Sequence, residues 1–335
     1  MSPTAPAVHV LHENPEWMAP FVEAFAAEGV PLVEHVLTGG TLDLQEEPAP
    51  GIWWSRMSAS SHTRGHAASS AHTRAVLSWL EAAGRRTVNG RRVLELELSK
   101  VDQLTALRAA GIDVPRTVVL VGADDGELLR AAKGFGGSFV TKHSQGGKGL
   151  GVARFDDPEE FAQVLAEGGL DEPVDGVWLL QEYVRPADDS ITRAEFVGGE
   201  FLYAVRADTA RGGFRLCPAD ACALDPATGR PLLPPGATVQ QEVGDQIFSL
   251  RRGFDHPVLQ DHARFLDGLG VEVAGIEFIE SADGRLVTYD VNTNTNYNAV
   301  VDAAAPRSGP REVARLTGRL LEQSLRAPAR DGGPR

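Results

Sequence analysis

The sequence predicts an α/β protein with an N-terminal βαβ domain, a central α+β lobe and a C-terminal lobe built on an antiparallel sheet. Strand-like and helix-like segments alternate through the first third of the chain, which indicates a parallel sheet with helices on its faces. A long glycine-rich connection joins two strand-like runs near the middle. In the last third, short turns separate paired strand-like runs, which is typical of hairpins.

The N-terminal unit is predicted to cover residues 1–95. Apolar runs predict its strands at Ala7–Leu11, Val33–Leu37 and Ile52–Met57. Apolar residues at helical spacing predict its helices at Pro15–Glu28 and Ala71–Ala83. Gly84 follows the second helix and marks its end. This order of elements predicts parallel strands joined by crossover helices.

The central lobe is predicted over residues 96–182. Ser99 is a good N-cap for the helix that opens this lobe, because its hydroxyl can accept from a free backbone N–H. The other elements follow from apolar runs and turn residues. In chain order the elements are predicted at Lys100–Ala110, Arg116–Val121, Asp124–Lys133, Ser138–Lys142, Gly151–Phe155, Pro158–Ala166 and Val177–Val184.

The C-terminal lobe is predicted over residues 183–326 and contains two hairpins. Thr192–Phe196 and Phe201–Arg206 flank Gly198 and Gly199, a two-residue turn signal. Gly275–Glu280 and Leu286–Asn292 flank a second turn at Ala282, Asp283 and Gly284. The Pro- and Gly-rich segment Pro226–Gly236 is expected to be a loop, and residues 327–335 a disordered tail.

Composition narrows the class of protein. The chain has 335 residues and a formal net charge of −14, so nucleic acid is an unfavourable partner. It has no run of apolar residues long enough for a membrane span, and its start does not resemble a signal peptide. Cys217 and Cys222 are the only cysteines and make a poor zinc site. We expect a cytoplasmic protein with reduced thiols.

The glycine-rich connection lies in SFVTKHSQGGKGLGVARF, which starts at Ser138. Glycine lets the backbone approach a ligand closely, and exposed N–H groups beside Lys142 and Lys148 suit phosphate oxygens. No Walker motif is present, and no G-x-G-x-x-G lies between a strand and a helix. The stretch therefore predicts a flap over phosphates. Taken alone, it also fits a mobile surface hairpin.

The last hairpin carries the opposite charge. Asp290 and Asn292 occupy alternate positions of one strand, so they face the same side of the sheet. The neighbouring strand brings Glu277 beside them. Two carboxylates and an amide oxygen suit Mg²⁺, with Mn²⁺ as an alternative. The competing interpretation is that these carboxylates merely face solvent.

The N-terminal unit has its own polar segment, WWSRMSASSHTRGHAASSAHTR, directly after a strand. Ligands bind beyond the carboxyl ends of strands in parallel sheets. Arginine and serine side chains there suit a substrate carboxylate. The alternative is a polar loop that only leads into the next helix, and a metal site at His62 and His66 is a weaker option. The candidate substrate residues are Arg56, Ser58, Ser60, Ser61, His62 and Arg64.

Between Ser99 and Asn298 the sequence resembles the ATP-grasp superfamily, and within it the RimK-type glutamate ligases. The resemblance rests on SKVDQLTALRAAGIDVPRT, VTKHSQGGKGLGV, LLQEYV, ITRAEFVGGEFLYAVRAD, GFRLC and GIEF followed by YDVN, in that order. It implies phosphate contacts for Lys100 and Lys142 and an adenine-binding hinge at Glu182, Tyr183 and Val184. The other implied nucleotide residues are Gly146, Gly147, Gly149, Gly151, Gln181 and Asp189.

The chain departs from that family's pattern at the acceptor side. Glu277 stands where aspartate is usual and Asp290 where glutamate is usual, which keeps the charge of the metal site. Cys217 stands where the RimK type has asparagine. NTNTNYN replaces the usual continuation after the metal hairpin, so Asn294 and Asn296 are expected to face the acceptor substrate. Glutamate addition is therefore not carried over from the resemblance.

The resemblance implies an ADP-forming carboxylate–amine ligase that works through an acyl phosphate. Arg193, Arg206, Arg215 and Lys148 are the candidate catalytic cations. The expected substrates are ATP, with Mg²⁺, and a small carboxylate and amine of the amino-acid type; a homo-oligomer is left open. Two other functions use similar residues. One is a kinase-like phosphotransferase, and the other is a non-catalytic nucleotide-binding module.

Overall fold

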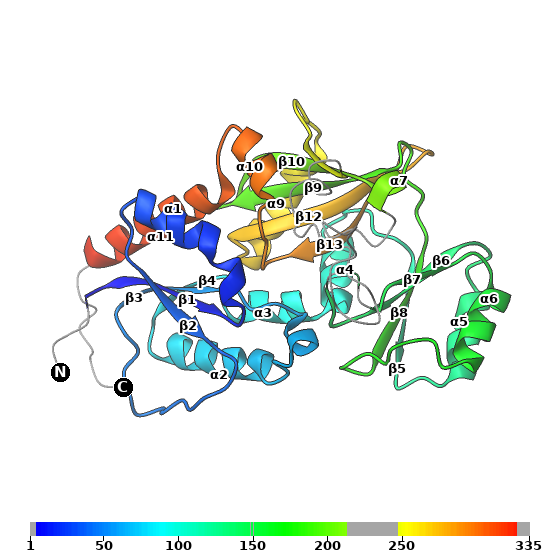
Figure 1. The fold of residues 1–335 in the computed structure, drawn as a ribbon, viewed down its shortest axis with the longest axis horizontal. Helices are drawn as coiled ribbons and strands as arrows, with labels where there is room; N and C mark the ends of the chain where they lie inside the picture. The colour runs from blue at the N-terminus through cyan, green and yellow to red at the C-terminus, as the bar shows by residue number, and fades with distance from the viewer. Residues whose placement is uncertain (1–4, 148, 150, 213–246, 327–335) are drawn as a thin grey trace, which may run out of the picture.

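The computed structural model describes residues 5–147, 149, 151–212 and 247–326. They form an α/β structure with a parallel sheet near the N-terminus and two antiparallel sheets after it (Figure 1). This is the predicted fold class. The predictions at Lys148, Arg215, Cys217, Pro226–Gly236 and 327–335 lie outside the described residues.

The N-terminal sheet has the order β2-β1-β3-β4, and its pairs are parallel. The single helix predicted over Pro15–Glu28 is divided in two at Met18. Pro20 explains the division, since proline lacks the N–H for a bond to residue i−4. The elements are β1 (Ala7–His12), η1 (Pro15–Trp17), α1 (Ala19–Ala27), β2 (Leu32–Val36), β3 (Gly51–Ser55), η2 (Ser61–Arg64), α2 (Ser69–Ala82), β4 (Arg86–Val88) and α3 (Arg91–Leu98).

The central lobe is an antiparallel sheet of order β5-β8-β6-β7 covered by α5 and α6 (Figure 1). Its core stacks Phe139 on Phe155, and both rings contact Phe161. Asp124 closes a capping box with Glu127, which fixes the start of α5. The elements are α4 (Lys100–Ala109), β5 (Thr117–Val121), α5 (Asp125–Lys133), β6 (Phe139–His143), β7 (Ala153–Phe155), α6 (Pro158–Ala166) and β8 (Val177–Glu182).

The C-terminal lobe has a sheet of order β11-β10-β9-β12-β13. Gly198 and Gly199 have φ of +62° and +80°, the left-handed values that the tight turn between β9 and β10 requires. The elements are β9 (Ser190–Val197), β10 (Glu200–Asp208), α7 (Thr209–Gly212), β11 (Phe248–Leu250), α9 (Val258–Leu269), β12 (Val273–Glu280), β13 (Leu286–Asn292), α10 (Ala299–Ala304) and α11 (Gly309–Arg326).

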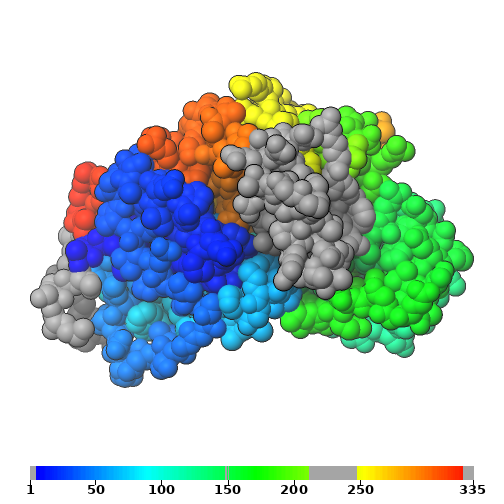
Figure 2. Space-filling view, in the orientation of Figure 1, coloured from blue at the N-terminus to red at the C-terminus, as the bar shows by residue number. Residues whose placement is uncertain are grey.

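The last helix ties the two ends of the chain together. In Figure 1, α11 runs beside α1, and Arg315 of α11 pairs with Glu28 at 2.9 Å. Trp54 of β3 shares one apolar core with Tyr203 of β10 and Val313 of α11. Figure 2 shows the N-terminal unit in blue against the orange and red C-terminal segments, with the green central lobe at the far end. This packing carries the carboxyl edge of the parallel sheet toward β12 and β13.

Candidate active site

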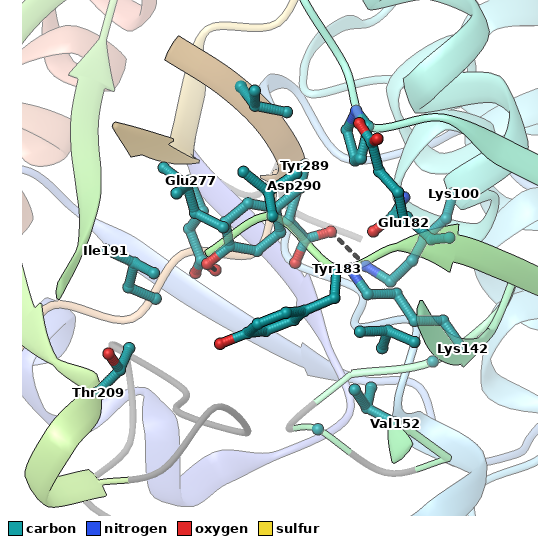
Figure 3. Close-up of a pocket in the computed structure, with 18 of the residues that line it drawn as sticks. Lys100, Lys142, Val152, Glu182, Tyr183, Ile191, Thr209, Glu277, Tyr289 and Asp290 are labelled. Atoms are coloured by element: carbon teal, nitrogen blue, oxygen red, sulfur yellow. Dashed lines mark hydrogen bonds and ion pairs between the residues drawn. The ribbon is translucent and has the colours of Figure 1, made fainter. Parts of the chain in front are cut away.

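One cleft lies between the central and C-terminal sheets, and it gathers residues predicted from separate motifs. Figure 3 shows Lys100 and Lys142 at one end, Ile191 and Thr209 at the other, and Tyr289 and Asp290 along the wall. Of the predicted nucleotide and metal residues, the cleft is lined by Lys100, Lys142, Gly146, Gly147, Gly149, Gln181, Glu182, Tyr183, Val184, Glu277, Asp290 and Asn292.

The two lysines of the cleft are held in different ways. Lys100 opens α4, whose N-cap Ser99 accepts a hydrogen bond from the Asp102 N–H. Its ammonium pairs with Asp290 (Figure 3). Burial opposes the charge of Lys100, but the Asp290 carboxylate outweighs burial and raises the pKa of Lys100. Lys142 lies 4.9 Å from the centre of the Tyr289 ring, and burial together with Lys100 lowers the pKa of Lys142 to about 8.

The predicted metal ligands converge on the hairpin of β12 and β13. The antiparallel register places Glu277 opposite Asp290. Asn292 Nδ2 lies 3.3 Å from Glu277 Oε1 and 3.3 Å from Asp290 Oδ2. Glu277 is only 5% exposed, so the solvent-facing alternative is wrong for this residue. Burial raises the pKa of Glu277 against the nearby charge of Arg193.

Arg193 is a buried cation next to the predicted metal ligands. Its Nη1 donates to Glu277 at 2.8 Å, and its Nε donates to Glu195 at 2.6 Å. Its Nη2 donates to Thr295 Oγ1 at 2.5 Å. A Cβ at Gly275 would lie 2.5 Å from this guanidinium, so glycine is required for Arg193 to cross β12. The network fixes a positive charge beside the carboxylates.

The hinge lines the cleft together with several apolar side chains. The N–H groups of Glu182 and Tyr183 donate to Arg116 and Ser138 carbonyls within the sheet. The N–H of Val184 makes no hydrogen bond to any described residue, so it is free for a ligand. The apolar side chains of the cleft lining include Val140, Val152, Val184, Ile191, Ile279 and Val287. An apolar slot with one free backbone donor suits a heteroaromatic ring.

Of the other predicted nucleotide and catalytic residues, Gln181 lines the cleft, whereas Asp189 and Arg206 do not. Gln181 donates to Thr117 Oγ1 at 3.0 Å and lines the cleft. Asp189 has φ of +51°, and its carbonyl accepts from the Thr209 N–H at 2.8 Å. Arg206 pairs with Asp188 at 3.1 Å and does not line the cleft.

Gly151, which follows the flap, also lies outside the lining of the cleft. A Cβ there would lie 2.5 Å from the His143 ring, and Gly151 has φ of +70°. Glycine is therefore required where the flap turns into β7.

The polar loop after β3 meets the flap. A Cβ at Gly147 would lie 3.2 Å from Ser60 Cβ, so flap and loop touch there. Ser60 Oγ accepts from Arg64 and lies 2.9 Å from Ser58 Oγ, while Ser61 is buried.

The histidines of this loop are held by other contacts. His62 Nδ1 lies 3.1 Å from the Ala59 carbonyl, and His66 pairs with Glu13 at 2.8 Å. Within the described ranges, no cluster of three or more His, Cys, Asp or Glu side chains is placed to hold a metal. The weak metal option at His62 and His66 therefore finds no support.

Glu97 is a residue of this region that the sequence did not indicate. Its carboxylate accepts from the N–H and the hydroxyl of Thr293, both at 2.8 Å, and from the Ala59 N–H at 3.3 Å. It therefore joins the N-terminal loop to the segment after the metal hairpin. Burial raises the pKa of Glu97. In the sequence it is one of the two glutamates of α3, and no local signal distinguishes it from Glu95.

No protein-family model matches the chain. A probable alpha-L-glutamate ligase of Xanthomonas euvesicatoria pv. vesicatoria (strain 85-10) is 28% identical over 260 residues, which is 76% of this chain and 75% of that protein. The RimK domain ATP-grasp protein of Sphaerobacter thermophilus DSM 20745 matches with a TM-score of 0.63 at 18% identity, covering 92% of this chain and 98% of that one. The D-cycloserine synthetase DcsG matches with a TM-score of 0.62 at 18% identity, covering 94% and 100%.

The fold is the ATP-grasp fold, and the chain is an ATP-dependent, ADP-forming carbon–nitrogen ligase that joins a carboxylate to an amine. Within that class, the recognition of a RimK-type ligase is confirmed. The relatives favour the ligase over the kinase-like phosphotransferase and over the non-catalytic module. No helix in the described part of the chain is long and apolar enough to cross a membrane.

Proposed function

We propose that the enzyme activates the carboxylate of an amino-acid-like substrate as an acyl phosphate and passes the acyl group to the amine of a second substrate. The observation that carries this proposal is the shared cleft. It brings two lysines, the flap glycines, the hinge and the Glu277–Asp290–Asn292 set onto one surface. These groups suit a nucleoside triphosphate with its metal ion. Ser60 of the N-terminal loop lies against Gly147 of the flap, so the loop is next to the cleft.

The nucleotide would lie along the cleft. Its base would lie against the hinge and accept a hydrogen bond from the free Val184 N–H. Its phosphates would reach Lys142 and Lys100 and be covered by the flap around Gly146, Gly147 and Lys148. Lys148 lies outside the described residues and keeps its predicted role.

Magnesium fits the donors at the other wall. Glu277 and Asp290 supply carboxylates, and a half-turn of the Asn292 amide would present its oxygen to a cation between them. These three residues would hold Mg²⁺, with Mn²⁺ as the alternative metal. When bound, the ion neutralises charge on phosphate oxygens.

The chemistry that we propose has two steps. A carboxylate oxygen of the acid attacks the γ-phosphorus, the bond to the β–γ bridging oxygen breaks, and ADP leaves. The amine then attacks the acyl carbon, inorganic phosphate leaves, and the nitrogen loses a proton. Arg193 lies beside Glu277, where its charge would stabilise the transferred phosphoryl group. Arg215 lies outside the described residues and keeps its predicted role, whereas Arg206 pairs with Asp188 away from the cleft lining and is given no role in this step.

Hydroxylamine tests the acyl phosphate directly. We expect enzyme, ATP, Mg²⁺ and a panel of amino acids and dicarboxylic acids to yield a hydroxamate with ADP and phosphate. AMP with pyrophosphate would contradict the acyl phosphate. ADP with a stable phosphorylated product and no hydroxamate would favour a kinase. L-Glutamate is the first amine to try, because the Xanthomonas relative is named for it. The cytoplasmic location and a homo-oligomer stay predictions.

A further inference from the structure

Among the described residues, Arg56 carries a positive charge that no carboxylate pairs with. Its side chain follows β3 and is 3% exposed. Its guanidinium carbon lies 4.2 Å from the centre of the Phe21 ring and 5.3 Å from the Trp54 ring. In the part of the chain that the structure describes, no aspartate or glutamate forms an ion pair with it. Burying an unpaired charge is costly, so this arrangement needs an explanation.

Arg64, from the same loop, differs in this respect. Its Nε and Nη2 bind the two carboxylate oxygens of Glu13 at 3.2 and 2.5 Å. It also lies over the Trp17 ring and donates to Ser60. Glu13 therefore already fills the place that a substrate carboxylate would take. Of the two arginines predicted for substrate, only Arg56 is left to pair with a ligand.

The donors of Arg56 are only partly used. Nη2 donates to Asn296 Oδ1 at 2.7 Å and to the Thr295 carbonyl at 2.9 Å. Among the described residues, Nη1 has only the weak acceptor Met18 Sδ at 3.3 Å, and the buried Nε has no partner. Nε and Nη2 form the edge by which Arg64 holds Glu13. On Arg56, a neutral amide oxygen occupies half of that edge.

Two more unpartnered polar atoms come from the same segment as Asn296. The hydroxyl of Tyr297 and the amide oxygen of Asn294 are buried and have no hydrogen-bond partner in the part of the chain that the structure describes. The Tyr297 ring packs 5.9 Å from Phe21, the residue on which Arg56 also lies. A ligand with an oxyanion would satisfy the Arg56 Nε and could accept from the Tyr297 hydroxyl.

The Arg56 group is connected to the reaction centre by hydrogen bonds. Thr295 accepts from Arg56 through its carbonyl and from Arg193 through its hydroxyl. Arg193 in turn donates to Glu277. A substrate that extends from the metal ligands toward the N-terminal unit would bring its far end to Arg56.

We infer that Arg56, with Asn296 and Tyr297, binds a non-reacting carboxylate of one of the two substrates. The Asn296 amide oxygen occupies the position of one carboxylate oxygen until that substrate binds. This inference rests on the proposed function and adds a chemical requirement to it. Either the acid is a dicarboxylate, or the amine is an amino acid with a free α-carboxylate.

The test uses Asn296→Asp, because this variant keeps Arg56 and gives it a permanent carboxylate partner. Asn298→Asp is the matched control, because that side chain caps α10 and aspartate is an equally good N-cap. ADP release is measured with proteinogenic L-amino acids and their α-amides as amines, with mono- and dicarboxylic acids, and with hydroxylamine as a carboxylate-free amine. Binding of the same compounds is followed by thermal shift, which needs no turnover.

We expect Asn296→Asp to raise the KM of the carboxylate-bearing substrate by roughly 10–150-fold, the range for loss of a charge-assisted contact. If the KM of the amine rises and turnover with hydroxylamine is unchanged, the amine carries the carboxylate that Arg56 binds. If the KM of the acid rises and stays raised when hydroxylamine is the amine, the acid carries this second carboxylate. In either case the α-amide or the monocarboxylate should be the poorer substrate for the wild type. Arg56→Lys should weaken the same substrate, with folding checked by melting temperature.

Two results would overturn the inference. One is an Asn296→Asp enzyme whose KM values for acid and amine both stay within twofold of the wild type. The other is a wild type that neither binds nor prefers any carboxylate-bearing compound over its neutral analogue. Failure of the proposed function looks different, because no hydroxamate and no ADP would then form in the wild type with any acid.

Discussion

Lys100 and Asp290 form an ion pair at one end of the cleft, although one is predicted to bind phosphate and the other metal. Each therefore supplies the countercharge that the other would find in a bound nucleotide and its ion. Without this ion pair, the Lys100 ammonium and the Asp290 carboxylate would each be buried without a countercharge, which is costly because both have lost their hydration. The pair keeps both groups charged, since it raises the pKa of Lys100 and, against the effect of burial, lowers the pKa of Asp290.

The first prediction concerns the cleft lysines. Lys142→Ala and Lys100→Ala should each weaken ATP binding by roughly 10–150-fold, because each removes a charge-assisted contact to phosphate. Titration calorimetry with a non-hydrolysable ATP analogue measures the effect. Lys133→Ala is the matched control, because that lysine is exposed at the end of α5. Wild-type affinity in both cleft variants would rule out the nucleotide assignment.

The second prediction concerns the metal. Asp290→Asn keeps the shape of the side chain and removes a charge, so the Mg²⁺ concentration for half-maximal activity should rise at least about tenfold. Asp283→Asn, in the turn of the same hairpin, should behave as the wild type, because Asp283 is exposed. Activity is titrated against Mg²⁺ at saturating ATP. An unchanged Mg²⁺ requirement in Asp290→Asn would move the metal site elsewhere.

The third prediction concerns Glu97 as a positioning residue. In the wild type, the Glu97 carboxylate accepts hydrogen bonds from Ala59 and Thr293. Glu97→Gln replaces one of its oxygens by an NH2 group, which cannot accept from these donors, so the free energy of unfolding should fall by about 1–3 kcal/mol. Glu97 joins the loop after β3, which is predicted to bind substrate, to Thr293. The KM of the acid or the amine should therefore rise, while the affinity for ATP stays the same. Glu95→Gln in the same helix is the control, since Glu95 pairs with Arg74 near the surface. Loss of stability without a change in KM would leave Glu97 a purely structural role.

The fourth prediction concerns stability in acid. His262 is fully buried between Phe196 and Phe278, and burial lowers the pKa of His262 from 6.5 to about 4. The His262 imidazole is therefore protonated below about pH 6.5 in the unfolded chain, but only below about pH 4 in the folded chain. Stability contributed by this residue is complete above pH 6.5 and declines as the pH falls toward 4, by at most about 3 kcal/mol.

Urea unfolding of the wild type and of His262→Gln between pH 7.5 and 4 measures this dependence. The variant should lose part of the acid slope, and the remaining slope includes His35, whose pKa burial also lowers to about 4. Identical slopes in both proteins would show that His262 is not the source.

Much of the fold follows from local sequence. The hairpin of β9 and β10 needs a turn with two left-handed residues, and Gly198 and Gly199 provide it. Alternation along β13 places Asp290 and Asn292 on one face, and the order of motifs identifies the ATP-grasp class. These features depend on neighbours within a few residues, so periodicity and turn chemistry are sufficient to predict them.

The tertiary structure decided what no local pattern carries. It paired Arg64 with Glu13 and gave Arg56 no carboxylate partner among the residues described, although the two arginines look alike in one loop. It brought Glu97 to Thr293, and α11 to α1, across long stretches of chain. The physical reason is that pairing and burial of a polar group depend on which distant surfaces pack together. The sequence determined the class of enzyme and predicted the residues for its phosphates and metal, whereas the packing of the N-terminal unit on the C-terminal lobe determined which of the two arginines has no carboxylate partner among the described residues.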